Sequence, residues 1–94
     1  MKIVKKLPGM AAEVIDIEIS LESLQKEVEG RIEAVTLIEG TAFICNEEGR
    51  LLGMKPNIII NEVGFVGPLL VVGVQGEHFS ELPQAERWAK MLNA

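Results

Sequence analysis

Apolar and polar residues alternate along the first twenty positions of the chain in a pattern that predicts two strands. Lys2–Leu7 is rich in apolar residues and stops at the turn-forming pair Pro8-Gly9. In Glu13–Ile19, isoleucines alternate with acidic residues, which is typical of a strand with one buried face. We therefore expect the two segments to pair as a loose hairpin.

The hydrophobic period then changes to that of a helix. Ser20 is a typical N-cap residue, and Gly30 stands where a short helix is expected to end. Between them, apolar residues at spacings of three and four predict an amphipathic helix; they are Leu21, Leu24 and Val28.

The middle of the chain predicts hairpins. The β-branched and apolar segments Arg31–Ile38 and Thr41–Asn46 are separated by Glu39-Gly40, and glycine adopts the positive φ of a tight turn at little cost. Glu47-Glu48-Gly49 resembles a second turn, so we expect Arg50–Leu52 to fold back as a third strand of this meander.

Two further apolar segments follow. Ile58–Ile60 favours a strand by its β-branched residues, whereas the flanking asparagines also suit a short buried turn, so both interpretations stay open. Leu69–Val74 is an unbroken apolar run, which predicts a central strand covered on both faces. Gly73 within it predicts a bulge or a close backbone approach.

The end of the chain predicts a second amphipathic helix, introduced by Ser80 and Pro83. Its apolar face comprises Ala85, Trp88, Ala89 and Leu92. Trp88 with its neighbours Met91 and Leu92 can serve either as an interface or as core, and we favour the core because a small domain needs its single Trp there.

These elements predict one α+β domain spanning residues 1–94, with a mostly antiparallel sheet of five or six strands and two short helices packed on one face. A chain of 94 residues is long enough for one core. Aromatic residues make up only 4% of the chain, so we expect an aliphatic core.

Charge and cysteine content limit the function classes. With 9 basic and 14 acidic residues the net charge is −5, which disfavours nucleic acid as a partner. The single cysteine, Cys45, cannot form an internal disulfide, and no apolar run approaches the ~20 residues that a membrane helix needs. The amino terminus does not read as a signal peptide, so we expect a cytoplasmic protein without a membrane partner.

The residues supply no recognisable catalytic set. His78 is the single histidine, and a metal site built from it would have to recruit carboxylates such as Glu47, Glu48 and Glu77 from separate loops. Cys45 lies in an apolar segment without a neighbouring base, so we interpret it as a small buried hydrophobe. We expect no catalytic residue, no metal and no cofactor.

The glycine-rich loops are the sharper candidate for a site. Backbone N–H groups in such loops can hold a phosphate or another anion, with Arg50 or Arg31 closing the site. The candidate ligand-binding residues are Asn46, Gly49, Arg50, Asn57 and Gly76, with Gly64 and Gly67 as further loop positions. Tight turns require the same glycines and asparagines for steric reasons alone, so both interpretations stay open.

Two blocks of this sequence are similar to a known family. The first is Asn46-Glu47-Glu48-Gly49-Arg50 followed by Gly53, Pro56 and Asn57, and the second is Val66-Gly67-Pro68, Leu69–Gly73 and Gly76-Glu77. Together they resemble the domain of unknown function 3846 family. The resemblance implies a cytosolic α+β domain of bacteria, phages or plasmids with no assigned activity, and it carries over no catalytic residues.

We therefore predict a small non-enzymatic binding or protein-interaction module of bacterial, phage or mobile-element origin, acting through a protein partner or as a homo-oligomer. A first alternative is a domain that captures a nucleotide-like or other small anionic ligand at its glycine-rich loops. A second is an acidic DNA-mimic inhibitor. An enzyme ranks last because no nucleophile–base set is apparent.

Overall fold

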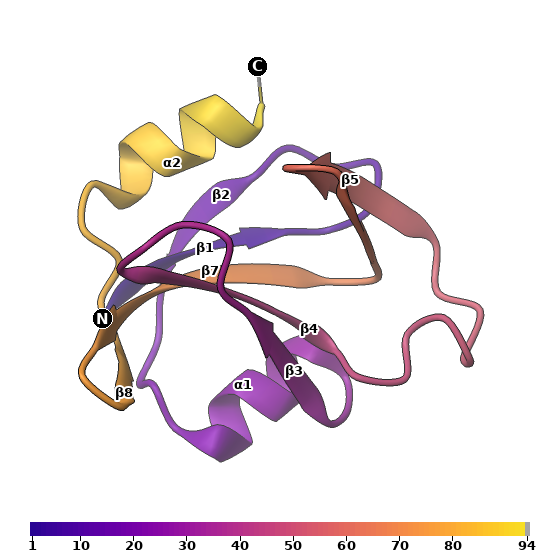
Figure 1. Cartoon of the computed structure of the whole chain (residues 1–94), viewed down its shortest axis with the longest axis horizontal. Helices are drawn as coiled ribbons and strands as arrows, with labels where there is room; N and C mark the ends of the chain where they lie inside the picture. The colour runs from indigo at the N-terminus through magenta and orange to yellow at the C-terminus, as the bar shows by residue number, and fades with distance from the viewer. Residues whose placement is uncertain (94) are drawn as a thin grey trace.

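The computed structural model describes residues 1–93 and shows an antiparallel sheet with a helix on each face and a separate two-stranded hairpin (Figure 1). The predicted α+β class and the mostly antiparallel sheet are confirmed, with six strands in the main sheet of the described part of the chain. The elements of residues 1–93 are β1 (Lys2–Lys6), β2 (Glu13–Asp16), α1 (Leu21–Val28), β3 (Ile32–Val35), β4 (Thr41–Asn46), β5 (Pro56–Ile60), β6 (Val63–Val66), β7 (Leu69–Gln75), β8 (His78–Ser80) and α2 (Ala85–Leu92).

Strand β7 lies at the centre of the main sheet. It pairs with β4 on one side and with β1 and then β8 on the other, all antiparallel. Its first five residues are buried, which confirms the prediction from their unbroken apolar run. Gly73 pairs with Thr41 and with Ser80, and a Cβ at this position would collide with the carbonyl oxygen of Glu81. The glycine therefore permits a close backbone approach.

The two faces of the main sheet carry separate cores, and each helix packs on its own face (Figure 1). Consecutive strand residues point to opposite faces, so Phe43 and Ile44 of β4 belong to different clusters. The buried residues of the α1 core are Ile3, Leu24, Val28, Ala42, Ile44, Leu70 and Val72. Those of the α2 core are Val4, Ala12, Phe43, Cys45, Phe65, Leu69, Val71, Leu82, Ala85 and Ala89.

The expectation that both helices pack on one face was wrong. Because β4 and β7 are apolar at consecutive positions, both faces of the sheet need a cover. One helix alone cannot bury two faces, so α1 covers one and α2 covers part of the other.

Strands β5 and β6 form the separate hairpin, which packs against the α2 core. The open question at Ile58–Ile60 is thus settled in favour of a strand. The turn residues Asn61 and Glu62 both have positive φ, 47° and 69°, as in a type I′ turn. Strand β6 was not predicted, because this turn contains no glycine and the strand itself is short.

The predicted third strand at Arg50–Leu52 was wrong. The segment after β4 winds through consecutive turns, in which Leu52 N donates to Glu48 O and Met54 N donates to Gly49 O, both at 2.9 Å. These local bonds satisfy the backbone without a neighbouring strand. The turn carries Leu51 on its outside, 86% exposed.

Helix α1 begins as predicted at Ser20, whose side chain accepts a bond from Ser23 N in a capping box. The helix also ends where expected, but the residue with left-handed backbone is Glu29 (φ 64°), not Gly30. A Cβ at Gly30 would lie 2.7 Å from Nδ2 of Asn46. Glycine is needed there so that this amide can reach the end of the helix.

Helix α2 presents its predicted apolar face to the α2 core, and Trp88 and Leu92 pack against that core. The Trp88 ring meets Phe43 edge-on, with ring centroids 5.9 Å apart, whereas Met91 is 51% exposed. Core packing therefore explains Trp88 and Leu92. Ser80, which was expected to introduce this helix, instead ends the unpredicted strand β8.

Candidate ligand-binding site

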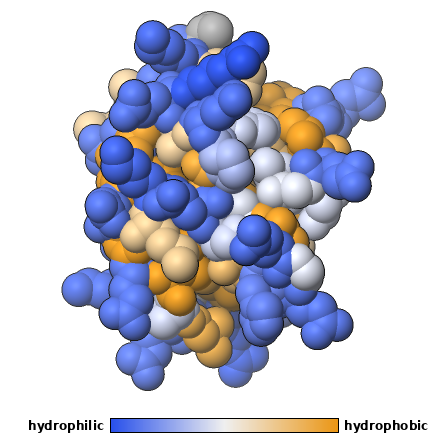
Figure 2. Space-filling model, turned by 90° about the vertical axis from the view of Figure 1, so that its left-hand side faces the viewer, coloured by the Kyte–Doolittle hydropathy of each residue, from blue (hydrophilic) through white to orange (hydrophobic). Residues whose placement is uncertain are grey.

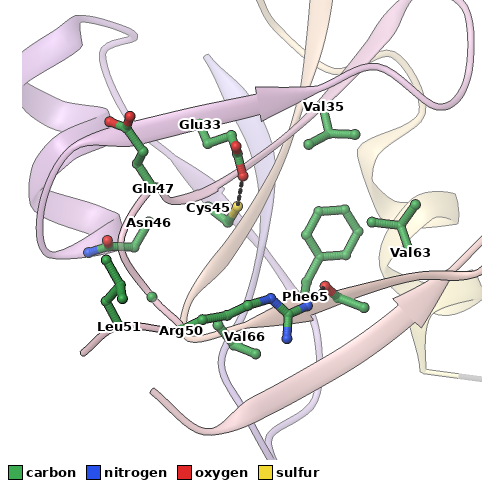
Figure 3. Close-up of a pocket in the computed structure, with 12 residues that line it drawn as sticks. Glu33, Val35, Cys45, Asn46, Glu47, Arg50, Leu51, Val63, Phe65 and Val66 are labelled. Carbon is green, nitrogen blue, oxygen red and sulfur yellow. Dashed lines mark hydrogen bonds between the residues drawn. The ribbon is translucent and has the colours of Figure 1, made fainter. Parts of the chain in front are cut away.

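A pocket of about 360 Å³ lies between the edge strand β3 and strand β6 of the separate hairpin (Figure 3). We call it the β3–β6 pocket. Strand β3 contributes Glu33 and Val35, the end of β4 contributes Cys45, and the turn after β4 contributes Glu47 and Arg50. All four residues of β6 line the opposite side.

The ladder between β3 and β4 decides which side chains enter the pocket. Glu33 pairs with Cys45, and Val35 pairs with Phe43, so these side chains share the face of the α2 core. On the other side, Nη2 of Arg50 donates to the carbonyl oxygen of Gly64 at 2.8 Å. This bond ties the turn after β4 to β6 and fixes the width of the pocket on that side.

Asn46 holds the frame of the pocket together. Its Nδ2 donates to Val28 O at 3.0 Å and to Glu29 O at 3.3 Å, and its Oδ1 accepts from Glu48 N at 2.8 Å. The residue is only 4% exposed. Both ends of the amide are therefore used within the fold, where they cap α1 and shape the turn that carries Arg50.

Gly49 lines the pocket for a steric reason. A Cβ at this position would lie 2.9 Å from Cγ2 of Val66, so glycine lets the turn approach β6 closely. Its N–H donates to Asn46 O at 3.1 Å. That group is therefore engaged within the fold instead of pointing toward a bound anion.

Asn57 and Gly76, the other two predicted ligand-binding residues, lie outside the β3–β6 pocket. Nδ2 of Asn57 donates to Lys6 O at 2.8 Å and to Gly67 O at 2.7 Å, which joins β1 to the connection between β6 and β7. Its Oδ1 is buried without a hydrogen-bond partner among residues 1–93. Gly76 (φ 61°) shapes the turn between β7 and β8. The fold thus gathers Asn46, Gly49 and Arg50 and separates them from the other two residues.

The family assignment follows from the whole described chain. Residues 1–93 match the family model of DUF3846, a domain of unknown function. The chain belongs to the DUF3846 family. No curated protein and no solved structure shows significant similarity to it.

The β3–β6 pocket of this DUF3846 chain carries charges of both signs. Glu33, Glu47 and Arg50 all line it, yet they form no ion pair with one another. The salt bridges found within residues 1–93 lie elsewhere and join the terminal amine to Asp16 and Lys5 to Glu27. In Figure 3, the carboxylate of Glu33 and the guanidinium of Arg50 approach the pocket from different sides. A ligand with both charges would find a partner for each.

Cys45 lies at the bottom of the pocket beside Glu33. The residue is 7% exposed, and its Sγ donates to Oε1 of Glu33 at 3.9 Å (Figure 3). Burial, followed by the Glu33 carboxylate, raises the pKa of the Cys45 thiol to about 11. The thiol is therefore neutral near pH 7, which agrees with its interpretation as a small buried hydrophobe.

Sequence reasoning missed Glu33 as a pocket residue. The available signal was its position in the alternation of the strand. Glu33 lies two residues before Val35 and four before Leu37, so its side chain lies on the same face as theirs, and both of those residues pack against the α2 core. A carboxylate on the inward side of a strand indicates either a partner or a site. The structure adds two facts that the sequence does not show: β3 ends at Val35, earlier than the predicted segment Arg31–Ile38, and it lies at the edge of the sheet. Both are needed to see that the Glu33 carboxylate faces a pocket.

His78 and Glu77 lie on another side of the DUF3846 domain. They line a smaller pocket of about 240 Å³ with Leu21 and Phe79, beside the start of α1. Figure 2 shows this side of the molecule, where hydrophilic side chains cover most of the surface and hydrophobic ones appear between them. Glu77 is therefore not brought to the pocket that Glu47 lines.

Within residues 1–93, no three His, Cys, Asp or Glu side chains are grouped so that they could hold a metal ion. None of the helices in that part of the chain has the length and apolar character needed to cross a bilayer.

Proposed function

We propose that this DUF3846 domain is a non-enzymatic binding module whose ligand is a small zwitterion, of the size of an amino acid or a dipeptide, held in the β3–β6 pocket. The observation that carries the proposal is the presence of carboxylates and a guanidinium that line one pocket without pairing with each other. Glu33, Glu47 and Arg50 are all exposed, so a ligand can reach these charges and pair with them.

The positive end of the ligand would lie against Glu33, whose carboxylate points into the pocket toward Cys45 (Figure 3). Its carboxylate would lie against Arg50, because a guanidinium has five N–H donors in a fork that matches a carboxylate, and the bond to Gly64 O uses only one of the two Nη groups. The apolar body of the ligand would contact Val35 and Phe65. Because each part of the ligand has its own partner in the pocket, the ligand would bind in one orientation.

The size of the pocket supports a small ligand. Ligand pockets span about 300–1,000 Å³, so a volume of about 360 Å³ lies at the small end of that range. A nucleotide-like anion is less well supported, because the N–H of Gly49 is engaged and two carboxylates line the same pocket.

The neutral, buried thiol of Cys45 supports the proposal that the domain is not an enzyme. A catalytic cysteine needs its pKa lowered and a base within reach. Here the pKa is raised to about 11, and His78 lines a different pocket. We further propose a cytoplasmic location, in keeping with a buried free thiol, and retain a protein partner as an alternative because Leu51, at the pocket, is exposed.

The experiment is a thermal-shift and calorimetric screen against the amino acids and a set of dipeptides, with phosphate and nucleotides as the anionic arm. A ligand present at 100 times its dissociation constant adds about 2.7 kcal/mol to the stability of the folded state. We expect stabilisation by a zwitterion, lost in Arg50→Ala and weakened in Glu33→Gln. Arg87→Ala and Glu86→Gln on α2 are the matched controls, since both residues are exposed away from the pocket.

Three outcomes would contradict the proposal in different ways. Stabilisation by anions alone, lost in Arg50→Ala but kept in Glu33→Gln, would favour the nucleotide-like ligand. Absence of any shift across both arms would remove the small-ligand function. Turnover of a bound compound would remove the non-enzymatic part.

A further inference from the structure

Strand β3 ends the main sheet and leaves one side of its backbone open. Within residues 1–93 it pairs with β4 and with no other strand. Glu47 N donates to Arg31 O at 2.8 Å, which makes Arg31 and Glu47 a hydrogen-bonded pair of the ladder. Because such pairs alternate with non-bonded ones, the N–H and C=O groups of Ile32 and Ala34 point away from β4. An edge of this kind is a template for another strand.

The charged side chains along the β3 edge of one copy can pair with those of the same edge in a second copy. Arg31 and Glu33 are exposed and flank Ile32, which is partly buried against the α1 core. If a second copy pairs antiparallel about a two-fold axis at Ile32, Arg31 of each copy lies directly opposite Glu33 of the other. Opposite charges placed in this way attract, and like charges repel.

The alternative registers lack this match. Moving the axis to Glu33 places the two Glu33 carboxylates opposite each other, which is unfavourable. Moving it to Ala34 places Glu33 opposite Val35, so no charge pair forms. Charge therefore favours the Ile32-centred register over these two alternatives.

The opposite edge of the sheet, at β2, offers no such match. The charged residues of Glu13–Ile19 are all acidic. Asp16 is already bound by the terminal amine at 2.8 Å. No antiparallel register of this edge with itself can therefore form an opposite-charge pair.

We propose that the domain forms a two-fold dimer through the β3 edge, with Ile32 at the axis, so that the main sheets of two copies become one continuous sheet. The partner is a second copy of this chain. Glu33 also lines the β3–β6 pocket, so Arg31 of the second copy would reach the rim of that pocket and contribute to it. The two proposals share Glu33, whose carboxylate has two oxygens and can accept both from Arg31 of the second copy and from a ligand. Sedimentation without ligand tests the dimer, and ligand titration tests the zwitterion site, so the failure of one proposal can be told from the failure of the other.

The test is sedimentation velocity of the wild-type chain from about 1 μM to about 1 mM, the range of weak association. We expect a dimer whose dissociation constant rises about tenfold or more in Arg31→Glu and in Glu33→Arg, because each change turns two attractive pairs into repulsive ones. Arg87→Glu makes the same charge change on α2 and should keep the wild-type constant.

The decisive arm is a mixture of the two variants. A chain with Arg31→Glu and a chain with Glu33→Arg restore both opposite-charge pairs in the Ile32-centred register, so the mixture should form a heterodimer at least as tightly as the wild type. Weak self-association of each variant combined with tight association of the mixture cannot come from misfolding. A mixture that associates no better than the separate variants would overturn the proposal.

Wild-type protein supplies a second readout that needs no variant. Amide exchange of Ile32 and Ala34 should slow as the protein concentration rises, because both N–H groups become bonded in the dimer. A chain that stays monomeric across the whole range, or one that dimerises without protecting these two amides, would overturn the proposal.

Discussion

The two faces of the main sheet differ in composition and in how completely they are covered. The α1 core is aliphatic, and its buried residues are at most 1% exposed under a single helix. The α2 core contains the tilted ring pair of Phe43 and Phe65, the edge-on pair of Phe43 and Trp88, and the thiol of Cys45. The β3–β6 pocket lies on this second face alone.

The difference shows how a small domain can separate stability from binding. One helix covers the α1 core, and the smaller pocket of about 240 Å³ opens beside its start. The other face is covered by two independent pieces, with α2 packed near β1 and β2 and the β5–β6 hairpin over the remainder. The hairpin does not reach the edge strand β3, and the gap between them is the pocket. We therefore expect changes in the α1 core to alter stability and changes at the pocket to alter binding.

The largest expected effect is that of Leu24→Ala in the α1 core. Removing a fully buried leucine side chain should lower the free energy of unfolding by about 2–5 kcal/mol, from the lost transfer energy and the cavity left behind. Urea denaturation measures this change, and ligand binding at the pocket should persist wherever the variant is folded. A stability loss well below 1 kcal/mol would contradict the description of this face as the closed core.

The next largest effect on stability is expected from Asn46→Ala. The Asn46 amide joins the end of α1, on one face, to the turn that carries Arg50, at the pocket on the other face. The change leaves the carbonyls of Val28 and Glu29 and the N–H of Glu48 without their partner, at a cost of about 1–3 kcal/mol. Gln75→Ala, at the exposed end of β7, is the control and should stay within about 0.5 kcal/mol of the wild type. Equal stabilities of the two variants would show that the Asn46 amide does not hold this junction.

Cys45 lies in the α2 core, and its titration should make the free energy of unfolding depend on pH. Its pKa is raised from 9.0 to about 11 in the folded state, so the neutral thiol is favoured by folding. The resulting stabilisation, about 2 kcal/mol or less, is fully present below pH 9 and is lost as the pH rises toward 11. The measurement is the difference in unfolding free energy between the wild type and Cys45→Ala as a function of pH. A difference that does not change between pH 8 and pH 11 would contradict the burial of this thiol beside Glu33.

The smallest effect on stability, and the largest on binding, is expected from Arg50→Ala. The side chain is exposed and makes one bond to Gly64 O, so its loss should change stability by about 0.5 kcal/mol or less. The dissociation constant of the zwitterion should rise about tenfold or more, because a hydrogen bond to a charged group contributes about 1.5–3 kcal/mol. Calorimetric titration beside Arg87→Ala measures both quantities. Loss of stability without loss of binding would reverse the roles assigned to the two faces.

Local patterns predicted much of the fold. Ser20 and the apolar spacing after it located α1, and the unbroken run Leu69–Val74 located the central strand. The missed elements depend on backbone geometry that residue type does not reveal. The hairpin turn uses left-handed Asn61 and Glu62 instead of glycine, and Arg50–Leu52 is held in turns by local bonds. The placement of the helices on opposite faces depends on the packing of the whole sheet.

The candidate site was predictable only in part, because a pocket depends on which segments meet. Asn46, Gly49 and Arg50 are close in sequence and stay together in space. Asn57 and Gly76 are of the same residue types as Asn46 and Gly49, but Asn57 joins β1 to the connection between β6 and β7, and Gly76 shapes the turn between β7 and β8. Glu33 joins the site through the register of the hairpin: a two-residue turn at Glu39-Gly40 would place it opposite Asn46, whereas β3 ends at Val35 and Glu33 pairs with Cys45.

The most direct test of the binding face is an amide chemical-shift titration of the labelled domain with the zwitterion that gives the largest thermal shift. We expect the perturbed amides to cluster at Glu33, at Cys45 to Leu51 and along β6. The amides around the smaller pocket, at Leu21, His78 and Phe79, should stay unchanged. Shifts confined to that second group, or spread evenly over both, would contradict the assignment of binding to the β3–β6 pocket.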